Sequence, residues 1–280
     1  MPTNQQRREA AKRKLERQLA RRAERAKKRR IIATALTVGG VVVVVGLIYL
    51  LVVLNSGEST NTATDATTEP TPPPAETTSG PCKYEKTPDQ PASKPVDVPA
   101  DVDPTPNAGT AKITLKTNQG EIPLTIDRAK APCTAQAIEH LAKSKFYDGT
   151  PCHRLTASDS LKVLQCGDPT GSGSGGPGFS TKKENPTNLA PAPSGNGSVI
   201  YPKGTLAMAA RSGSNVTESQ FFLVYADSTL PPDYPVFGTI DPAGLATIDK
   251  IAAGGITPGD NGPTDGAPKN AVTVETATVS

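Results

Sequence analysis

The chain has 280 residues, of which 35% are hydrophobic and 20% are charged, so its average composition excludes a protein that is disordered throughout. The net charge of +3 is the sum of two opposed parts, because 13 Lys and Arg side chains face only 3 Glu in the first 30 residues and the remainder is acidic. The overall basicity is therefore no evidence for nucleic-acid binding, and we expect no nucleic-acid partner.

The basic arm of residues 1–30 is followed by residues 31–54, which are 24 positions without a charged side chain. As a helix rising about 1.5 Å per residue, this segment would span the roughly 30 Å hydrocarbon core of a bilayer. A buried helix of a soluble domain is the less favoured alternative. A cleaved signal peptide is also disfavoured, since its apolar region would be only about 7 to 15 residues long. Because the basic residues lie on one side of the segment, the positive-inside rule predicts a single-pass protein of the cell membrane with a cytoplasmic N-terminus.

Residues 55–109 are rich in Thr, Pro, Ser and Ala, and this composition predicts a disordered, mostly extended extracytoplasmic linker. The chain has four cysteines, and all of them follow the apolar segment, on the side of the membrane where disulfides persist. An even number favours two bridges, and four cysteines allow three connectivities. A free, redox-sensing thiol is the alternative.

Residues 110–280 are predicted to form one compact, mainly β domain. Alternation of apolar and polar residues predicts strands, and apolar residues at helical spacing predict helices. Eight strands and two helices without a regular βαβ rhythm indicate an antiparallel barrel with helices closing its ends. The expected strands are 110–117, 121–127, 152–155, 161–165, 204–209, 220–225, 236–240 and 271–278, and the expected helices are 132–145 and 242–253.

The glycine-rich run 167–178 contains the spacing G-x-G-x-x-G, but a dinucleotide-binding fingerprint needs a helix directly afterwards, which Pro177-Gly178 prevents. We interpret the run as a loop that shapes the backbone. The two histidines have no Cys or carboxylate at metal-ligand spacing, and no serine lies in a nucleophile elbow. The sequence therefore predicts no metal site, no cofactor and no hydrolase.

Five motifs occur in a specific order: FYDGTPCHR from Phe146, QCGDPTG from Gln165, GTLAMA from Gly204, SQFFL from Ser219 and VFGTI from Val236. In this order they resemble the cyclophilin family over residues 110–280. With the basic arm, apolar segment, linker and cysteines, the chain looks like a membrane-anchored cyclophilin of the actinobacterial type. The resemblance implies a closed eight-stranded antiparallel β-barrel capped by two helices. It also implies a peptidyl-prolyl cis-trans isomerase, or rotamase, that acts on Xaa-Pro-containing polypeptides and assists protein folding outside the cytoplasmic membrane.

By the same resemblance, Arg154 and Gln165 are the expected catalytic residues, and Phe222 is the expected floor of a proline pocket. Rotation about a peptide bond faces a barrier of about 18–20 kcal/mol, because the C–N resonance must be broken. A catalyst therefore needs hydrogen-bond donors that favour the twisted amide, and a guanidinium is a rigid, permanently charged donor. The remaining substrate-binding candidates are Val163, Ala209, Ala210, Leu230 and Tyr234.

The resemblance also places Cys152 and Cys166 on neighbouring antiparallel strands, where facing side chains are close enough for a disulfide. We therefore expect a Cys152–Cys166 bridge. It would leave Cys82 and Cys133 to hold the linker against the first helix.

The chain departs from the family at several places. Gln165 follows Arg154 by 11 positions, more than is usual, which predicts a longer turn over 157–160. Lys162-Val163 stands at a Phe-Met pair, Thr229 at a common Trp and Tyr234 at a common His, so we expect weak cyclosporin binding. These changes keep open a second function, a catalytically weak scaffold that binds Pro-containing partners at the membrane.

Overall fold

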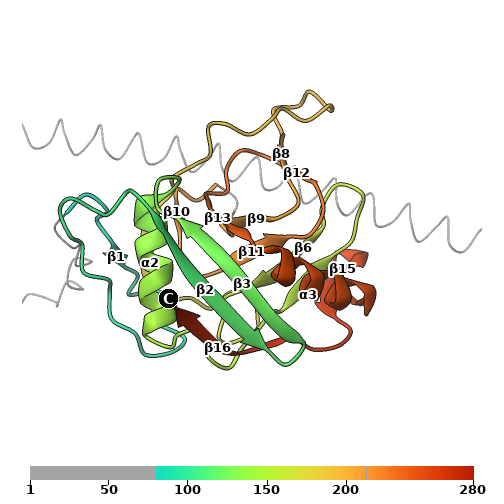
Figure 1. The fold of residues 1–280 in the computed structure, drawn as a ribbon, viewed down its shortest axis with the longest axis horizontal. Coiled ribbons are helices and arrows are strands. Elements are labelled where there is room, and N and C mark those ends of the chain that lie inside the picture. Colours follow the sequence, from blue (N-terminus) through green and yellow to red (C-terminus); the bar gives the residue numbers. More distant parts are fainter. Residues whose placement is uncertain (1–79, 212) are drawn as a thin grey trace, which may run out of the picture. The chain divides into compact units, whose positions relative to one another are not determined.

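The computed structural model describes residues 80–211 and 213–280 (Figure 1). The predicted basic arm (1–30), apolar segment (31–54) and the first part of the predicted linker (55–79) lie outside these residues. No helix within the described ranges has the length and apolar character needed to cross a membrane.

The domain is built on one sheet of eleven strands, all paired antiparallel. Its longest pairing is the hairpin of β2 and β3, in which alternate side chains are buried, as the sequence pattern predicts. Gly120 closes the hairpin turn with a φ of +128°, which glycine adopts without strain. The strands of the sheet are β2 (Thr110–Thr117), β3 (Gly120–Asp127), β4 (Thr150–Pro151), β5 (Arg154–Thr156), β6 (Val163–Cys166), β9 (Thr205–Met208), β11 (Phe221–Val224), β13 (Val236–Ile240), β14 (Ile256–Gly259), β15 (Gly262–Pro268) and β16 (Thr273–Val279).

The sheet curls, but no ladder between described strands closes it, so the predicted closed eight-stranded barrel is wrong in this respect. The strand order is β14-β15-β5-β6-β11-β9-β13-β3-β2-β16-β4, with β14 and β4 at the two edges. The chain itself continues from β4 to β5 through Cys152 and His153, where the pairing is interrupted. Pro151 ends β4 and has no N–H with which to extend a ladder. At this point β4 and β5 are therefore connected by the covalent chain and not by a hydrogen-bonded ladder.

Two shorter sheets complete the strand structure. The first is β1-β7-β10, made of β1 (Glu85–Lys86), β7 (Phe179–Lys182) and β10 (Val216–Thr217). The second pairs β8 (Val199–Tyr201) with β12 (Ser228–Leu230). None of these five strands was predicted, because each is only two to four residues long.

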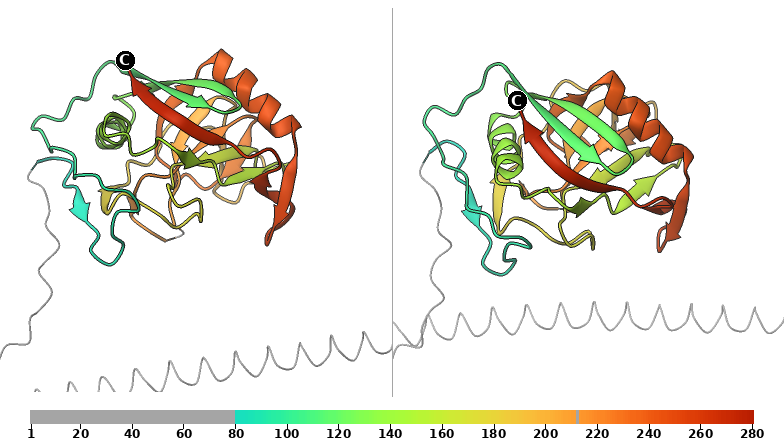
Figure 2. Two further views of the ribbon diagram at one scale, coloured as in Figure 1. Left: turned by 90° about the horizontal axis from the view of Figure 1, so that it is seen from below. Right: turned by 60° about the horizontal axis from the view of Figure 1, so that its bottom comes forward.

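Helices α2 (Pro132–Lys143) and α3 (Pro242–Ala253) lie at opposite ends of the curled sheet (Figures 1 and 2). Each begins with proline in its first turn, where the missing N–H would have no partner in any case. The predicted helix 242–253 is confirmed. The first helix ends two residues earlier than predicted, and Lys145, just after the C-cap residue Ser144, has a φ of +57°.

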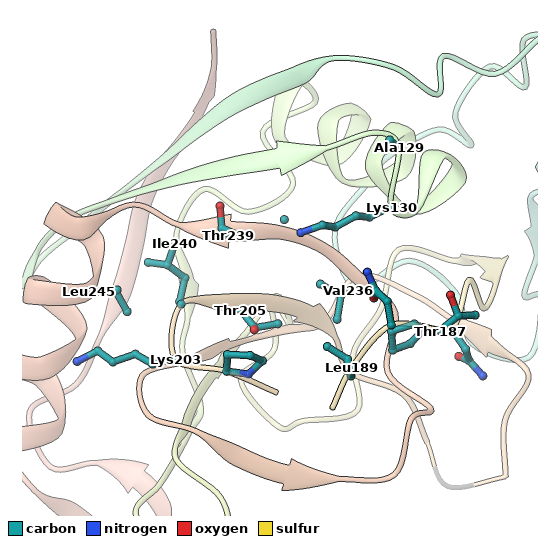
Figure 3. A pocket seen from close by; sticks show the side chains of 16 residues that line it. Ala129, Lys130, Thr187, Leu189, Lys203, Thr205, Val236, Thr239, Ile240 and Leu245 are labelled. Atoms are coloured by element: carbon teal, nitrogen blue, oxygen red, sulfur yellow. The ribbon is translucent and has the colours of Figure 1, made fainter. Parts of the chain in front are cut away.

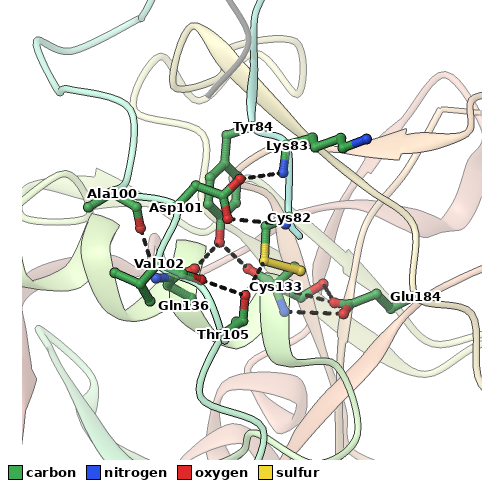
Figure 4. The surroundings of a disulfide bond; sticks show 11 residues. Cys82, Lys83, Tyr84, Ala100, Asp101, Val102, Thr105, Cys133, Gln136 and Glu184 are labelled. Carbon is green, nitrogen blue, oxygen red and sulfur yellow. Dashed lines mark hydrogen bonds between the residues drawn. A yellow bond between two sulfur atoms is a disulfide. The ribbon is translucent and has the colours of Figure 1, made fainter. Parts of the chain in front are cut away.

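Residues 81–106, here called the N-terminal arm, lie against the domain although their composition is that of a linker (Figure 4). Tyr84 is fully buried, and its hydroxyl lies within donating distance of two acceptors in α2, the Cys133 carbonyl at 2.9 Å and Oε1 of Gln136 at 2.8 Å. The β1–β7 ladder holds the arm from the other side. The arm therefore contributes to the core from the edge of the domain.

A disulfide between Cys82 and Cys133 fixes the arm to the first turn of α2, and the second disulfide joins Cys152 to Cys166. Both predicted pairings are confirmed. Beside the first bridge, the Glu184 carboxylate accepts hydrogen bonds from the backbone N–H groups of Cys133 and Thr134, at 3.1 and 2.9 Å. It thus satisfies two donors at the start of α2 that no side chain of the helix caps (Figure 4).

We expect the double variant Cys82→Ser/Cys133→Ser to lower the free energy of unfolding by about 2–4 kcal/mol, since the bridge closes a long loop in the unfolded chain. Urea denaturation of residues 80–280 followed by circular dichroism measures it. Lys83→Ser, an exposed neighbour, serves as the control and should change stability by less than about 0.5 kcal/mol. Equal stability of the double variant and the wild type would contradict this account of the arm.

Candidate functional site

Four neighbouring strands place a row of side chains on one face of the sheet. In the ladders, Arg154 of β5 lies opposite Gln165 of β6, Gln165 lies opposite Phe222 of β11, and Phe222 lies opposite Ala207 of β9. Residues directly opposite one another in antiparallel strands point to the same side of the sheet. The structure therefore brings the two predicted catalytic residues and the predicted pocket floor together.

Asp265 of β15 holds the Arg154 guanidinium from the side away from Gln165. Its carboxylate accepts from Nε at 2.7 Å and from Nη2 at 2.8 Å, so that the pair is bidentate. Gln165 accepts a third hydrogen bond, from Nη1 at 3.2 Å. A guanidinium has five N–H groups, and two of them remain without an acceptor among the described residues.

Gln165 is itself held by a polar chain that continues to the glycine-rich loop. Its Nε2 donates to Oε1 of Gln220 at 3.0 Å, and Nε2 of Gln220 donates to the carbonyl of Gly175 at 3.1 Å. Hydrogen bonding from Arg154 lowers the pKa of Asp265, and the same contact raises the pKa of Arg154. Both members of the ion pair are therefore charged at neutral pH.

Beside this polar row lies an apolar cluster that contains five of the six predicted substrate-binding residues. Phe222 and Val163 are buried in it at 5% and 2% exposure, and Ala209, Leu230 and Tyr234 are half-buried around them. The ring centroids of Phe222 and Tyr234 are 5.6 Å apart in an edge-to-face arrangement. The sixth residue, Ala210, lies outside the cluster and lines a cavity beside Gln165.

The Cys152–Cys166 disulfide is adjacent in sequence to the row, because Cys152 precedes Arg154 by two residues and Cys166 follows Gln165. Both cysteines are buried, at 3% and 0% exposure. The bridge therefore ties together the two strand segments that present the polar side chains. The connection between β5 and β6 spans 157–162, with an isolated bridge between Ser158 and Leu161, in keeping with the longer turn predicted there.

The glycine-rich run forms a loop organised around the buried carboxylate of Asp168. This carboxylate accepts from the backbone N–H groups of Thr170, Gly173 and Gly175 at 2.8, 2.7 and 3.1 Å. Burial alone would raise the pKa of Asp168, but the hydrogen bonds outweigh burial and the pKa is lowered. The loop leads into strand β7 and not into a helix, so the loop offers no helix N-terminus at which a phosphate could bind.

His153 lies between the disulfide and Arg154. Its Nδ1 is buried and has no hydrogen-bond partner among the residues that the structure describes. Burial lowers the pKa of His153, the Asp168 carboxylate partly opposes this, and the Arg154 cation adds to it. The imidazole is therefore neutral beside Arg154 at neutral pH. Over the described ranges, no three His, Cys, Asp or Glu side chains are grouped closely enough to hold a metal ion.

A cavity of about 620 Å³ opens elsewhere, between the start of α3, strands β9 and β13, and the loop 185–189 (Figure 3). Its cations are Lys130 and Lys203, and Lys203 is paired with Asp249 at 2.9 Å. It shares Leu189 and Val236 with the apolar cluster, but no residue of the Arg154 row lines it. Size alone therefore does not identify the site, and the polar row with its apolar neighbour is the better candidate.

Sequence reasoning missed three polar residues of the site: Asp265, Gln220 and Asp168. Asp265 lies in a glycine-rich hairpin 111 positions after Arg154, and no spacing rule connects the two. Gln220 lies in the motif SQFFL at the start of the predicted strand 220–225, and this position was the available signal. Asp168 is the second residue of the glycine-rich run, and an Asp that hydrogen-bonds the backbone of a following turn is common.

Comparisons with known proteins show which family the chain is similar to. Residues 112–279 match the family model described as cyclophilin type peptidyl-prolyl cis-trans isomerase/CLD. A probable peptidyl-prolyl cis-trans isomerase B of Mycobacterium tuberculosis is 48% identical over 98% of this chain and 93% of the relative. A probable isomerase B of Mycobacterium leprae is 48% identical over 69% of this chain and 65% of the relative. A crystal structure of a Cryptosporidium parvum cyclophilin type isomerase covers 61% of this chain and 98% of its own, with a TM-score of 0.45 and 22% identity.

We expect His153 to titrate below its usual value of 6.5. Because folding lowers this pKa, the contribution of the neutral imidazole to stability is complete above pH 6.5 and is lost as the pH falls toward the folded-state pKa. An NMR titration of residues 80–280 carrying His140→Gln measures it, since the chain has only two histidines. A pKa at or above 6.5 would contradict the described burial.

Proposed function

The chain belongs to the cyclophilin-type peptidyl-prolyl cis-trans isomerase family, and from this premise we propose how its own residues carry out the reaction. The protein is a peptidyl-prolyl cis-trans isomerase, which interconverts the cis and trans forms of Xaa-Pro bonds. Uncatalysed, this interconversion takes tens to hundreds of seconds. No covalent bond is made or broken, so the task of the site is to lower the cost of twisting the amide.

In the proposed mechanism, Arg154 donates hydrogen bonds to the substrate through the two N–H groups that have no acceptor among residues 80–211 and 213–280. A twisted amide has lost C–N conjugation, and its nitrogen lone pair becomes an acceptor that the planar ground state does not offer. A donor fixed at that position binds the transition state more tightly than the substrate, which is the requirement for catalysis. The guanidinium suits this role because it is planar and permanently charged.

Asp265 acts as a positioning residue in this proposal. It occupies Nε and one N–H of Nη2, at 2.7 and 2.8 Å, and so fixes the plane of the guanidinium. Gln165 accepts from Nη1, the third nitrogen of the guanidinium. Its Nε2 uses one N–H on Gln220 and offers the other to the substrate backbone. The donors are thereby oriented before substrate arrives, which avoids reorganisation during the rotation.

The apolar cluster receives the proline ring in the same proposal. Phe222 lies across the ladder from Gln165, so a ring packed over the cluster would have its amide beside the polar row. Leu230, Ala209 and Tyr234 are half-buried and offer apolar surface at the edge of the cluster. The observation that carries the assignment is the cross-strand row of Arg154, Gln165 and Phe222 on one face.

We expect Arg154→Ala to reduce kcat/KM for an Xaa-Pro peptide by about 100-fold or more, the usual cost of removing a transition-state donor. Arg154→Lys keeps the positive charge but lacks the planar guanidinium with its fixed N–H donors, and should retain only part of the activity. A protease-free assay on residues 80–280 measures both. Lys116→Ala, which removes an exposed cation, is the control. Equal rates for Arg154→Ala and the wild type would favour the scaffold function instead.

The wider proposal is that this isomerase works outside the cytoplasmic membrane, anchored by residues 31–54. Three features support it: 24 consecutive uncharged positions, basic residues on one side only, and two disulfides in the part that follows. A domain held at the outer surface would meet proteins as they emerge unfolded, when their Xaa-Pro bonds are most heterogeneous.

This topology predicts that protease added to intact spheroplasts removes the isomerase domain from the full chain and leaves a fragment that includes residues 1–54 in the membrane. A version beginning at residue 80, expressed in the cytoplasm, should be protected from the same protease. Protection of the full chain in intact spheroplasts, with digestion only after lysis, would overturn the proposed orientation. Western blotting against tags at each end provides the measurement.

A further inference from the structure

The N-terminal arm reaches the isomerase site, although it precedes residues 112–279, which the family model matches. The disulfide at Cys82 and the buried Tyr84 fix its first residues. Beyond them, β1 pairs with β7, which directly follows the glycine-rich loop. The arm is thus carried from α2 to the loop that flanks Gln165 and Gln220.

The arm and the glycine-rich loop meet backbone to backbone. The N–H of Thr87 donates to the carbonyl of Gly178 at 2.9 Å, and the N–H of Ser93 donates to the carbonyl of Gly176 at 2.8 Å. The N–H of Gly176 in turn donates to Oγ of Ser93 at 2.8 Å. A Cβ on Gly178 would lie only 2.7 Å from the backbone nitrogen of Ala92. Glycine is therefore required there for the arm to approach.

Between the arm and the site lies a cavity of about 250 Å³. Thr87 and Gln90 of the arm line one side, and Gln165, Ala209 and Gln220 line the side that faces the isomerase row. The Thr87 hydroxyl donates to the carbonyl of Gln90 at 3.0 Å, which fixes the turn that presents both residues. Gln90 is exposed, so its amide is available to a ligand in the cavity.

The side chains that line this cavity indicate which kind of substrate side chain would bind in it. The charged side chains of the lining, Arg211 and Glu218, face each other at 3.8 Å and offset one another. The remaining polar groups are mainly side-chain amides and hydroxyls, which act both as donors and as acceptors. A lining of this kind suits an uncharged polar side chain with both functions, such as that of Gln or Asn.

From these contacts we infer that the N-terminal arm is part of the substrate site, with Gln90 as a specificity-determining residue. The cavity takes the uncharged polar side chain of a substrate residue near the isomerised Xaa-Pro bond. This inference rests on the proposed function, because it places the cavity beside the residues that act on that bond. It assigns to the arm a preference that residues 112–279 alone would lack.

The test compares kcat/KM for matched peptides that differ only by Gly or Gln at each position flanking the Xaa-Pro pair, in the protease-free assay. Gln90→Trp would fill the mouth of the cavity. We expect it to lower the Gln-to-Gly ratio of kcat/KM at least fivefold at one flanking position. The control is Asp89→Trp, because Asp89 directly precedes Gln90, is exposed and does not line the cavity. This variant adds the same bulk and should leave the ratio unchanged.

Three outcomes would overturn the inference: an unchanged ratio in Gln90→Trp, an equal loss for every peptide, or the same change in Asp89→Trp. Each is distinguishable from failure of the proposed function. The function itself is read from the wild type and Arg154→Ala on the all-Gly peptide, which does not use the cavity. Circular dichroism melting of Gln90→Trp checks that an exposed substitution has left the fold intact.

Discussion

The register of β5, β6 and β11 is the constraint on which the site depends. A slip of one residue between β6 and either neighbour would turn Gln165 to the opposite face and separate Arg154 from Phe222. The strands are short, with three residues in β5 and four each in β6 and β11, so their ladders alone hold the register weakly. The Cys152–Cys166 bridge adds a covalent restraint between the chain segments that carry Arg154 and Gln165. Catalysis here therefore relies on a backbone alignment that a disulfide secures.

Much of the site could be predicted, because the motif order carries the residues that face the substrate. Arg154, Gln165 and Phe222 lie together as expected, and the apolar cluster gathers all but Ala210 of the predicted binding residues. Asp265 could not be found in this way, since its partnership with Arg154 depends on where the β14–β15 hairpin folds back. The same limit applies to Gln90, whose role depends on how a Pro-rich segment docks.

The fold was predictable where periodicity is long, whereas the two- to four-residue strands of the two smaller sheets were missed. The eight-residue strands β2 and β3 and helix α3 match their predicted bounds to within a residue. The closed barrel was wrong because strand pairing is interrupted at Cys152 and His153, which alternation of residue types does not predict. The docking of the arm depends on single side chains, above all Tyr84, which no periodic pattern marks in a linker-like composition. Local sequence patterns thus specify helices and strands, whereas individual side-chain contacts determine how segments dock at the edges of the domain.

The two disulfides join cysteines in the order in which they occur along the chain, first with second and third with fourth. The loops that they close, spanning 51 and 14 positions, neither overlap nor enclose one another. A polypeptide that emerges from its N-terminus meets each correct partner before the next cysteine appears. Oxidation in simple sequence therefore gives the native pairing, without the reshuffling that nested or crossed bridges demand.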